Sequence, residues 1–130
     1  MIEEEKLAFD SYTQLYAKWG ARVFGNILQS EANHQSQVLT VMNNLNIADP
    51  RSDSVGVFKN ADLQVLYDEL MVKGAKSAQD AYEVGIAIEE RDIADITDML
   101  ATADDADYIA MLERLRQGSE NHLRAFNNQI

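Results

Sequence analysis

Apolar residues recur along almost the whole chain at steps of three and four, which is the spacing of one face of an α-helix. No segment alternates apolar and polar residues in the way that a strand would. Proline, which interrupts helices, occurs once in 130 residues, and the six glycines fall mostly at breaks in the apolar pattern. The sequence therefore predicts an all-α fold built from long helices.

The breaks divide the chain into four long helical segments and one short one. The expected helices cover about residues 2–19, 22–45, 61–73, 78–100 and 105–126. Ser77 is placed to cap the fourth of these helices, and Asp104 or Asp105 the fifth. Residues 46–60 are rich in turn-forming residues and predict a loop. Because the loop and the short helix together can cross the body of a bundle, we expect a four-helix bundle with one long crossover that contains a short extra helix.

The composition is that of an ordinary globular protein, with 46% apolar and 25% charged residues. The length fits one domain, residues 1–130, around a single hydrophobic core. Acidic residues number 22 and basic residues 11, so the formal net charge is −11. A field of that sign repels phosphate groups and attracts cations, and we expect no nucleic-acid or anionic-membrane partner.

The chain contains no cysteine, which excludes disulfides, thiolate nucleophiles, iron–sulfur clusters and rubredoxin-type iron sites. No apolar run approaches the roughly eighteen residues that a membrane-spanning helix needs. The first five residues are mostly acidic, unlike the basic start of a secretory signal. We therefore expect a cytoplasmic protein, unless the chain is a trimmed precursor.

The apolar stripes indicate which side chains face the interior of the bundle. The stripe of the first helix is Glu5, Ala8, Tyr12, Leu15, Tyr16 and Trp19. The stripe of the second is Phe24, Ile27, Leu28, Glu31, His34, Val38, Val41, Met42 and Leu45. The 78–100 helix has two inner rows, Tyr82, Ile86, Glu89, Ile93, Ile96, Leu100 and Ala81, Gly85, Ile88, Asp92, Ile96, Met99. The last helix presents Leu112, Leu115, Ser119, His122 and Phe126. Carboxylate or imidazole side chains thus interrupt every stripe.

Glu31 and His34 are three residues apart on the second stripe, so their side chains project side by side and could bind the same ion. The same pair also suits a boundary salt bridge. On the last helix His122 faces inward, where a lone histidine is also typical of ordinary core packing. Glu120 lies about 200° away around that helix and should point outward.

Glu89 and Asp92 form a second pair three residues apart, whereas Glu90 falls on a solvated flank of the same helix. Each member of the pair also suits a position at the rim of the core. On the first helix Glu5 is in line with the apolar stripe, and Glu4 is the alternative. The acidic cluster at that helix start also fits simple stabilisation of the helix dipole.

Together the four long helices present six inward side chains of the kinds that bind metals. These candidate ligands are Glu5, Glu31, His34, Glu89, Asp92 and His122. Four buried, ionised carboxylates without positive partners would each cost several kcal/mol, more in total than a domain's stability of about 5–15 kcal/mol. Arg91 and Arg124 fall off the inner rows, and a neutral histidine adds no charge. Two divalent ions would cancel the four charges, and oxygen and nitrogen ligands suit iron, manganese or zinc. We therefore expect a dinuclear metal site.

The spacing of these residues also resembles the motifs of a known superfamily. Residues 5–12 read Glu-Lys-Leu-Ala-Phe-Asp-Ser-Tyr, similar to a first-helix pattern Glu-x-x-Ala-x-x-x-Tyr that favours Glu5 over Glu4. Residues 31–34 match a second-helix Glu-x-x-His motif, and residues 89–92 are similar to a pair of acidic residues on a third helix. On these motifs, and over nearly its full length, the chain resembles the ferritin-like superfamily, in particular a small branch of its rubrerythrin-like di-iron carboxylate proteins.

One position departs from that resemblance. The fourth helix of these proteins carries Glu-x-x-His, whereas here Ser119 stands three residues before His122. The departure removes a bridging carboxylate, and we expect Asp92 to supply the lost oxygen.

The resemblance implies a di-iron centre that reacts with O₂ or peroxide, as an oxidase, peroxidase or ferroxidase. Because the chain has no cysteine and therefore no built-in rubredoxin, the electrons would come from a separate donor. The inner aromatic residues of the first helix could carry oxidising equivalents, although ordinary core packing is the better explanation for them. The alternative function is a metal-binding or structural bundle without redox turnover, and a haem between His34 and His122 is a third reading. The sequence is compatible with iron, manganese or zinc as the metal, and with a monomer or an oligomer.

Overall fold

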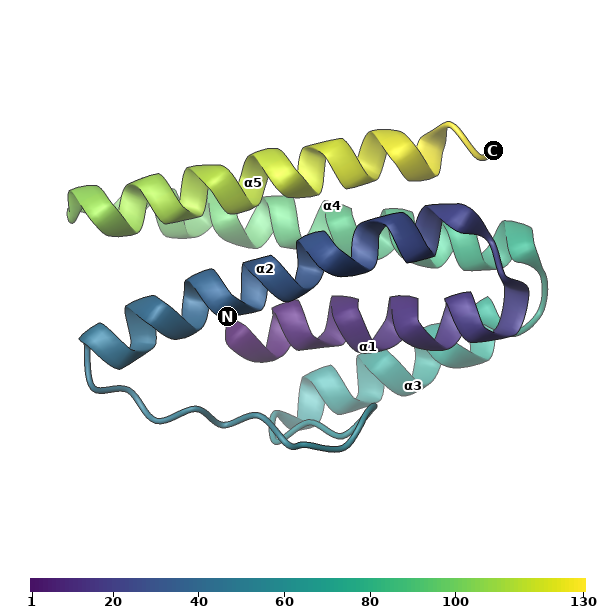
Figure 1. Cartoon of the computed structure of the whole chain (residues 1–130), viewed down its shortest axis with the longest axis horizontal. Coiled ribbons are helices and arrows are strands. Elements are labelled where there is room, and N and C mark those ends of the chain that lie inside the picture. Colours follow the sequence, from purple (N-terminus) through teal and green to yellow (C-terminus); the bar gives the residue numbers. More distant parts are fainter.

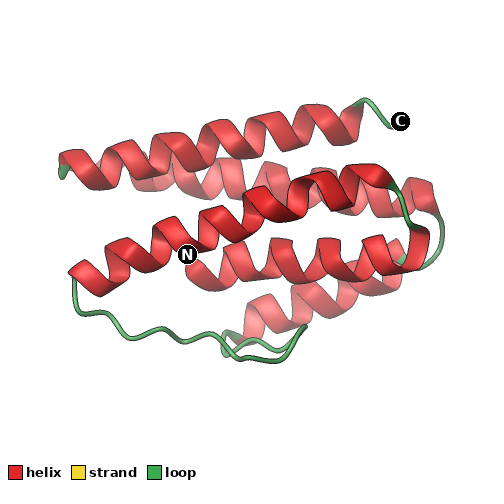
Figure 2. Ribbon diagram, in the orientation of Figure 1, coloured by secondary structure: helices red, strands yellow, loops and turns green.

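The computed structural model describes residues 1–130 and contains five α-helices and no strand (Figure 2). The helices are α1 (Ile2–Trp19), α2 (Arg22–Asn44), α3 (Ala61–Gly74), α4 (Ala78–Thr102) and α5 (Ala106–Asn127). These bounds confirm the predicted all-α bundle, with four long helices and a short fifth one in the crossover. None of the helices combines the length and the apolar composition needed to cross a membrane.

The long helices lie side by side, and helices that follow one another in the sequence run in opposite directions (Figure 1). α1 and α2 form one antiparallel pair, and α4 and α5 form the other. α2 and α4 run in the same direction, because the loop after α2 and helix α3 return the chain along the bundle. α3 packs against α1 and α4. The structure therefore confirms the single long crossover.

Local capping groups fix the helix ends near the predicted positions. Gly20 ends α1 in the left-handed conformation, with φ of 65°, and its N–H donates to the carbonyl of Tyr16. The hydroxyl of Ser77 accepts from the N–H of Asp80, as predicted, and begins α4. Of the two candidates for the start of α5, Asp105 is the cap. These side chains satisfy backbone groups that have no partner within the helix.

The apolar core is divided into two clusters by a polar layer. The larger cluster is Leu7, Ala8, Tyr12, Leu15, Val23, Phe24, Ile27, Phe58, Leu63, Tyr67, Ala81, Val84, Ile88 and Phe126. The smaller one is Ile2, Val38, Ile96, Met111, Leu112 and Leu115. On each long helix, the residues that lie in sequence between the two clusters include the predicted metal ligands. The polar layer thus lies between two apolar clusters along the helix axes.

Two of the predicted stripe residues are not in the core. The prediction for Tyr16 is wrong, because its side chain is 43% exposed and packs over Gly25 on α2, which has no side chain to displace it. The prediction for Leu45 is also wrong, because it follows the last turn of α2 and is 63% exposed. Trp19 is partly buried, and its indole N–H donates to the carbonyl of Gly74 at 2.8 Å. The prediction of buried side chains from the stripes is therefore wrong near these helix ends.

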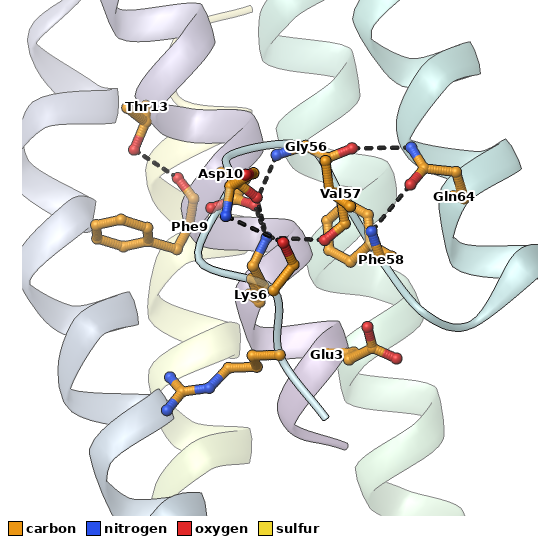
Figure 3. A network of polar contacts seen from close by, with 12 residues as sticks. Glu3, Lys6, Phe9, Asp10, Thr13, Gly56, Val57, Phe58 and Gln64 are labelled. Atoms are coloured by element: carbon orange, nitrogen blue, oxygen red, sulfur yellow. Dashed lines mark hydrogen bonds and ion pairs between the residues drawn. The ribbon is translucent and has the colours of Figure 1, made fainter. Parts of the chain in front are cut away.

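A buried ion pair that the sequence did not indicate fastens the crossover loop to α1 (Figure 3). Lys6 and Asp10 are one helical turn apart on α1 and are 6% and 4% exposed. The Lys6 ammonium also donates to the carbonyls of Ser54, at 2.9 Å, and Val57, at 3.1 Å. The Asp10 carboxylate also accepts from the N–H of Gly56 at 3.0 Å. Backbone groups of a loop about fifty residues away thus depend on these two side chains.

Glu3 and Gln64 extend this fastening to the start of α3. The Glu3 carboxylate accepts from the N–H groups of Lys59, at 2.7 Å, and Asn60, at 3.1 Å. Gln64 accepts from the N–H of Phe58 and donates to a loop carbonyl (Figure 3). The face of α1 that carries these contacts is turned to the crossover, which leaves the Glu5 face turned to the interior.

Candidate metal centre

All six predicted ligands lie in the buried polar layer. Their exposed fractions are 0% for Glu31 and Glu89, 2% for Glu5, 4% for Asp92, 5% for His34 and 7% for His122. They come from all four long helices, so no single helix could assemble the layer. A layer of this composition is unusual, because charged side chains are rarely buried without a partner of opposite charge or a metal ion.

Five of the six candidate ligands form two groups of three that share Glu31. In the first, which we call the His34 group, Glu5, Glu31 and His34 bring ligand atoms within 4.8 Å of one another. The second, the His122 group, does the same with Glu31, Glu89 and His122. Asp92 is in neither group, although it is buried beside them.

The two oxygens of Glu31 face different groups. His34 Nδ1 lies 3.5 Å from Glu31 Oε2 and 3.3 Å from an oxygen of Glu5. His122 Nδ1 lies 2.9 Å from Glu31 Oε1 and 3.3 Å from an oxygen of Glu89. A carboxylate placed in this way can give one oxygen to each of two neighbouring ions. The arrangement follows from the three-residue spacing of Glu31 and His34, which sets both on the inner face of α2.

Several buried polar atoms of the layer have no aligned hydrogen-bond partner. These atoms are Glu5 Oε2, both carboxylate oxygens of Glu31, Glu89 Oε2, Asp92 Oδ2, His34 Nδ1 and Ser119 Oγ. Buried polar atoms in proteins almost always have a partner, and a group of orphans at one place indicates a bound ion or water. Carboxylate oxygens and imidazole nitrogens are the ligands that iron, manganese and zinc accept. The donor set therefore fits such an ion.

The separations between these atoms agree with that fit. Around an ion with bonds of about 2.1 Å, neighbouring ligand atoms lie about 3.0 Å apart in an octahedron and about 3.4 Å apart in a tetrahedron. The four nitrogen–oxygen distances within the two groups run from 2.9 to 3.5 Å. The side chains thus stand as close as the ligands of one ion do within each group.

The histidines compensate the carboxylates electrostatically in the protein alone. Burial disfavours their charged forms, but the adjacent carboxylates outweigh it, which raises the pKa of His34 to about 10 and that of His122 to about 9. Burial also opposes ionisation of Glu31, yet the two imidazoles lower its pKa to about 2. In the protein without an ion, these raised pKa values favour the protonated forms of both histidines at neutral pH, so the expectation of uncharged histidines is wrong.

The remaining carboxyls are pushed toward their neutral forms. Burial and the charge of Glu31 raise the pKa of Glu89 to about 7. Burial raises the pKa of Glu5 against the opposing effect of His34. Burial and the charges of Glu5 and Glu89 raise the pKa of Asp92 well above its ordinary value. Carboxyls that resist ionisation in this way bind a cation in exchange for a proton.

Hydroxyl groups from neighbouring helices contact the His122 group. The hydroxyl of Tyr12 donates to Glu89 Oε1 at 2.8 Å. The outer nitrogen of His122, Nε2, lies 3.0 Å from the hydroxyl of Ser30. The sequence did not single out Ser30, because a serine beside a ligand on a helix carries no spacing signal of its own.

The other acidic residues that the sequence singled out lie outside both groups. Glu4, the alternative to Glu5, is half-buried, and burial together with hydrogen bonding to Asp95 raises its pKa to about 7. Glu90 is exposed, as predicted, and Glu120 is half-buried. Glu5 is therefore the first-helix member of the layer.

The arrangement of the two imidazoles does not fit the hypothesis of a haem bound between them. The rings of His34 and His122 are stacked at 25°, with centroids 5.6 Å apart, and both turn Nδ1 to carboxylates. Two axial ligands would instead point at each other across a porphyrin. The structure thus brings the histidines together with acids rather than around a flat cofactor.

Comparison with known proteins places the chain in a family. Residues 1–130 match the model described as "Uncharacterized protein domain (DUF2202)" over the whole chain. The chain belongs to the DUF2202 family. It is 46% identical over 127 residues to uncharacterized protein MJ0754 of Methanocaldococcus jannaschii, an alignment that covers 97% of this chain and 69% of that protein.

A solved structure has the same fold as this chain. The crystal structure of hypothetical protein MJ0754 from Methanococcus jannaschii matches with a TM-score of 0.94 at 46% identity. The match covers 97% of this chain and 73% of that one. The arrangement of helices that builds the polar layer is therefore shared with a solved relative.

Proposed function

We propose that this DUF2202 chain is a dinuclear metal carboxylate protein, with iron as its resident metal, and that it acts as an oxidase, peroxidase or ferroxidase. The observation that carries the proposal is the position of Glu31, whose two oxygens face two separate groups of ligands. Each group adds one histidine and one further carboxylate. Ions held in the two groups would supply the chemistry for a small oxygen-containing substrate.

In this proposal the His34 group and the His122 group each hold one ion, and Asp92 supplies a further oxygen. Iron bound there would supply electron transfer to O₂ or peroxide. The chain itself keeps the layer dry between two apolar clusters, and Tyr12 orients Glu89 through its hydrogen bond. Because the chain has no cysteine, a separate protein would supply electrons.

We also propose that the family belongs with the ferritin-like superfamily and its rubrerythrin-like proteins. Two features support this placement. The chain has two antiparallel helix pairs joined by one long crossover (Figure 1), and the ligands stand on the first, second, third and fourth long helices in the order of that superfamily's motifs. The substitution at Ser119 is the departure from those motifs.

The alternative is a bundle that keeps the fold and its polar layer without redox turnover. Ser119 favours it, because a buried hydroxyl without a partner replaces an expected carboxylate. Protonated His34 and His122 favour it as well, since they balance part of the negative charge without any ion. The two functions differ in whether the loaded protein turns over.

The metal content of the purified protein tests the first part of the proposal. Protein expressed in iron-supplemented medium is expected to hold two metal ions per chain. The Glu31→Gln variant should hold fewer than one, because both groups lose a ligand. The matched control is Glu90→Gln, which makes the same change at an exposed position beside Glu89 and should still hold two. Equal metal content in Glu31→Gln and Glu90→Gln would exclude the proposed centre.

The reaction itself is tested by rapid mixing. Protein loaded with ferrous iron is mixed with O₂ or peroxide, and iron oxidation is followed by absorbance. Oxidation faster than that of the same concentration of free ferrous iron supports the oxidase, peroxidase or ferroxidase function. A rate equal to that of free iron, in protein that binds two ions per chain, would favour the alternative without redox turnover.

A further inference from the structure

The two histidines of the proposed centre differ in what their outer nitrogens contact. His122 Nε2 lies 3.0 Å from the hydroxyl of Ser30 on α2. His34 Nε2 faces Gly118 on α5, where a Cβ would lie only 2.5 Å from it. Ser30 and Gly118 hold equivalent positions, because each stands four residues before the histidine of its own helix and faces the histidine of the other. The imidazole of His122 therefore contacts a hydroxyl group, whereas the imidazole of His34 lies against the backbone of a glycine.

The carboxylates show the same asymmetry. Glu89 of the His122 group accepts a hydrogen bond from the Tyr12 hydroxyl. Glu5 of the His34 group has no such neutral donor, and its Oε2 faces the imidazole of His34, at 3.3 Å. Hydroxyl groups outside the ligand set thus hold the His122 group, whereas the His34 group depends on its own members.

We infer that Ser30 is a positioning residue that acts on the His122 position alone and so makes the two metal positions inequivalent. This inference rests on the proposed dinuclear centre. In the protonated imidazole both ring nitrogens carry a proton, and when an ion has replaced the Nδ1 proton and that proton has gone to solvent, the remaining ring N–H is on Nε2. His122 therefore donates to the Ser30 hydroxyl in either case. The bond fixes the rotation of the ring, and with it the direction of Nδ1 toward Glu31 and Glu89. Partners of this kind change metal affinity about 10- to 100-fold in known metal sites.

Gly118 plays the complementary part for His34. Its missing side chain leaves the space that the His34 ring occupies. A Cβ there would push the ring, because 2.5 Å is far below a van der Waals contact and the atoms that Cβ meets belong to the rigid imidazole rather than to a flexible chain end. Substitutions at Ser30 and Gly118 should therefore weaken different positions.

Titration with Co²⁺ against a competing chelator tests this selectivity. The purified protein, stripped of metal, is expected to bind two equivalents. The equivalent that disappears in His122→Gln is assigned to the His122 position, and the one that disappears in His34→Gln to the other. Ser30→Ala should weaken the first equivalent 10- to 100-fold and leave the second within about twofold. Gly118→Ala should show the reverse pattern.

Two further variants separate positioning from a general loss of structure. Ser30→Thr keeps the hydroxyl and should restore the affinity of the His122 equivalent. Ser36→Ala removes an exposed hydroxyl from the same helix and should change neither equivalent. The imidazole Nε2–H proton of His122, observed by NMR in metal-free protein, should exchange slowly in the wild type and in Ser30→Thr, and rapidly in Ser30→Ala.

The outcomes distinguish this inference from the proposed function. If the wild type binds two equivalents and Ser30→Ala weakens both equally or neither, Ser30 does not position His122. Failure of Ser30→Thr to restore the affinity would overturn the inference in the same way. If the wild type binds less than one equivalent of Co²⁺ and of iron, the dinuclear centre itself is refuted, and the inference falls with it.

Discussion

Replacing Lys6 by Met should destabilise the fold far more than replacing an exposed lysine. The substitution keeps the length of the side chain and removes the ammonium group. Asp10, which is 4% exposed, then keeps only the N–H of Gly56 as a hydrogen-bond donor. The carbonyls of Ser54 and Val57 lose a charged donor as well. Every partner that the ammonium leaves behind lies in the fastening between α1 and the crossover loop (Figure 3).

The size of the effect follows from the burial of these groups. Removing one member of a buried ion pair costs about 3–5 kcal/mol, because the other charge is left unpaired. We therefore expect Lys6→Met to lower the free energy of unfolding by about 3–5 kcal/mol, a large part of the roughly 5–15 kcal/mol of a typical domain.

Urea unfolding followed by helical circular dichroism measures this loss. The matched control is Lys73→Met, which removes the same group from a pair with Glu83 that is 3.7 Å apart, with both side chains more than 40% exposed. That pair should be worth less than about 1 kcal/mol. The double variant Lys6→Met/Asp10→Leu should recover part of the stability, because no buried charge is then left unpaired. A loss in Lys6→Met no larger than that in Lys73→Met would show that the buried pair does not fasten the loop.

Two further predictions concern the polar layer. Treatment with a chelator should lower the melting temperature of protein purified with its metal. The loss should be equivalent to about 3 kcal/mol for each ion whose free concentration was a hundred times its dissociation constant. Identical melting curves with and without chelator would contradict this. In chelated protein the raised pKa values of His34 and His122 contribute stability that is complete below about pH 6.5 and is lost as the pH rises through 9 and 10. Urea unfolding from pH 6 to pH 10 should show that decline, and His34→Gln should reduce it.

The helices could be predicted from the sequence because their signals are local. Ser77 and Asp105 each cap a helix through an N–H three residues on, so the cap can be seen within a single turn. The stripes could be predicted for the same reason, and they identified the inner face of each helix. Tyr16 and Leu45 were misplaced because burial near a helix end depends on how far the neighbouring helix extends, and no spacing rule contains that information.

The fastening of the crossover could not be predicted, because its partners are distant backbone atoms. In the sequence, Lys6 and Asp10 show only the four-residue spacing that is common to ion pairs on exposed helix faces. Their burial results from carbonyl and N–H groups of a loop about fifty residues further along. Backbone atoms are the same in every residue, so the sequence does not show which of them a lysine will meet. The same holds for Ser30, whose partner His122 is on another helix.

The candidate ligands could be predicted as residues that face inward, but not their division into groups. Helical spacing puts Glu31 and His34 on one face, whereas only the packing of α2 against α5 gives one oxygen of Glu31 to each histidine. From the sequence, metal ions were the only compensation expected for the buried carboxylates. The folded layer can also reduce its negative charge by binding protons, because the pKa values of its two histidines and of Glu89 are raised. Protons and metal ions therefore compete for the same atoms, so the affinity for an ion should decrease as the pH is lowered. The side chains can stay buried whether they hold protons or ions.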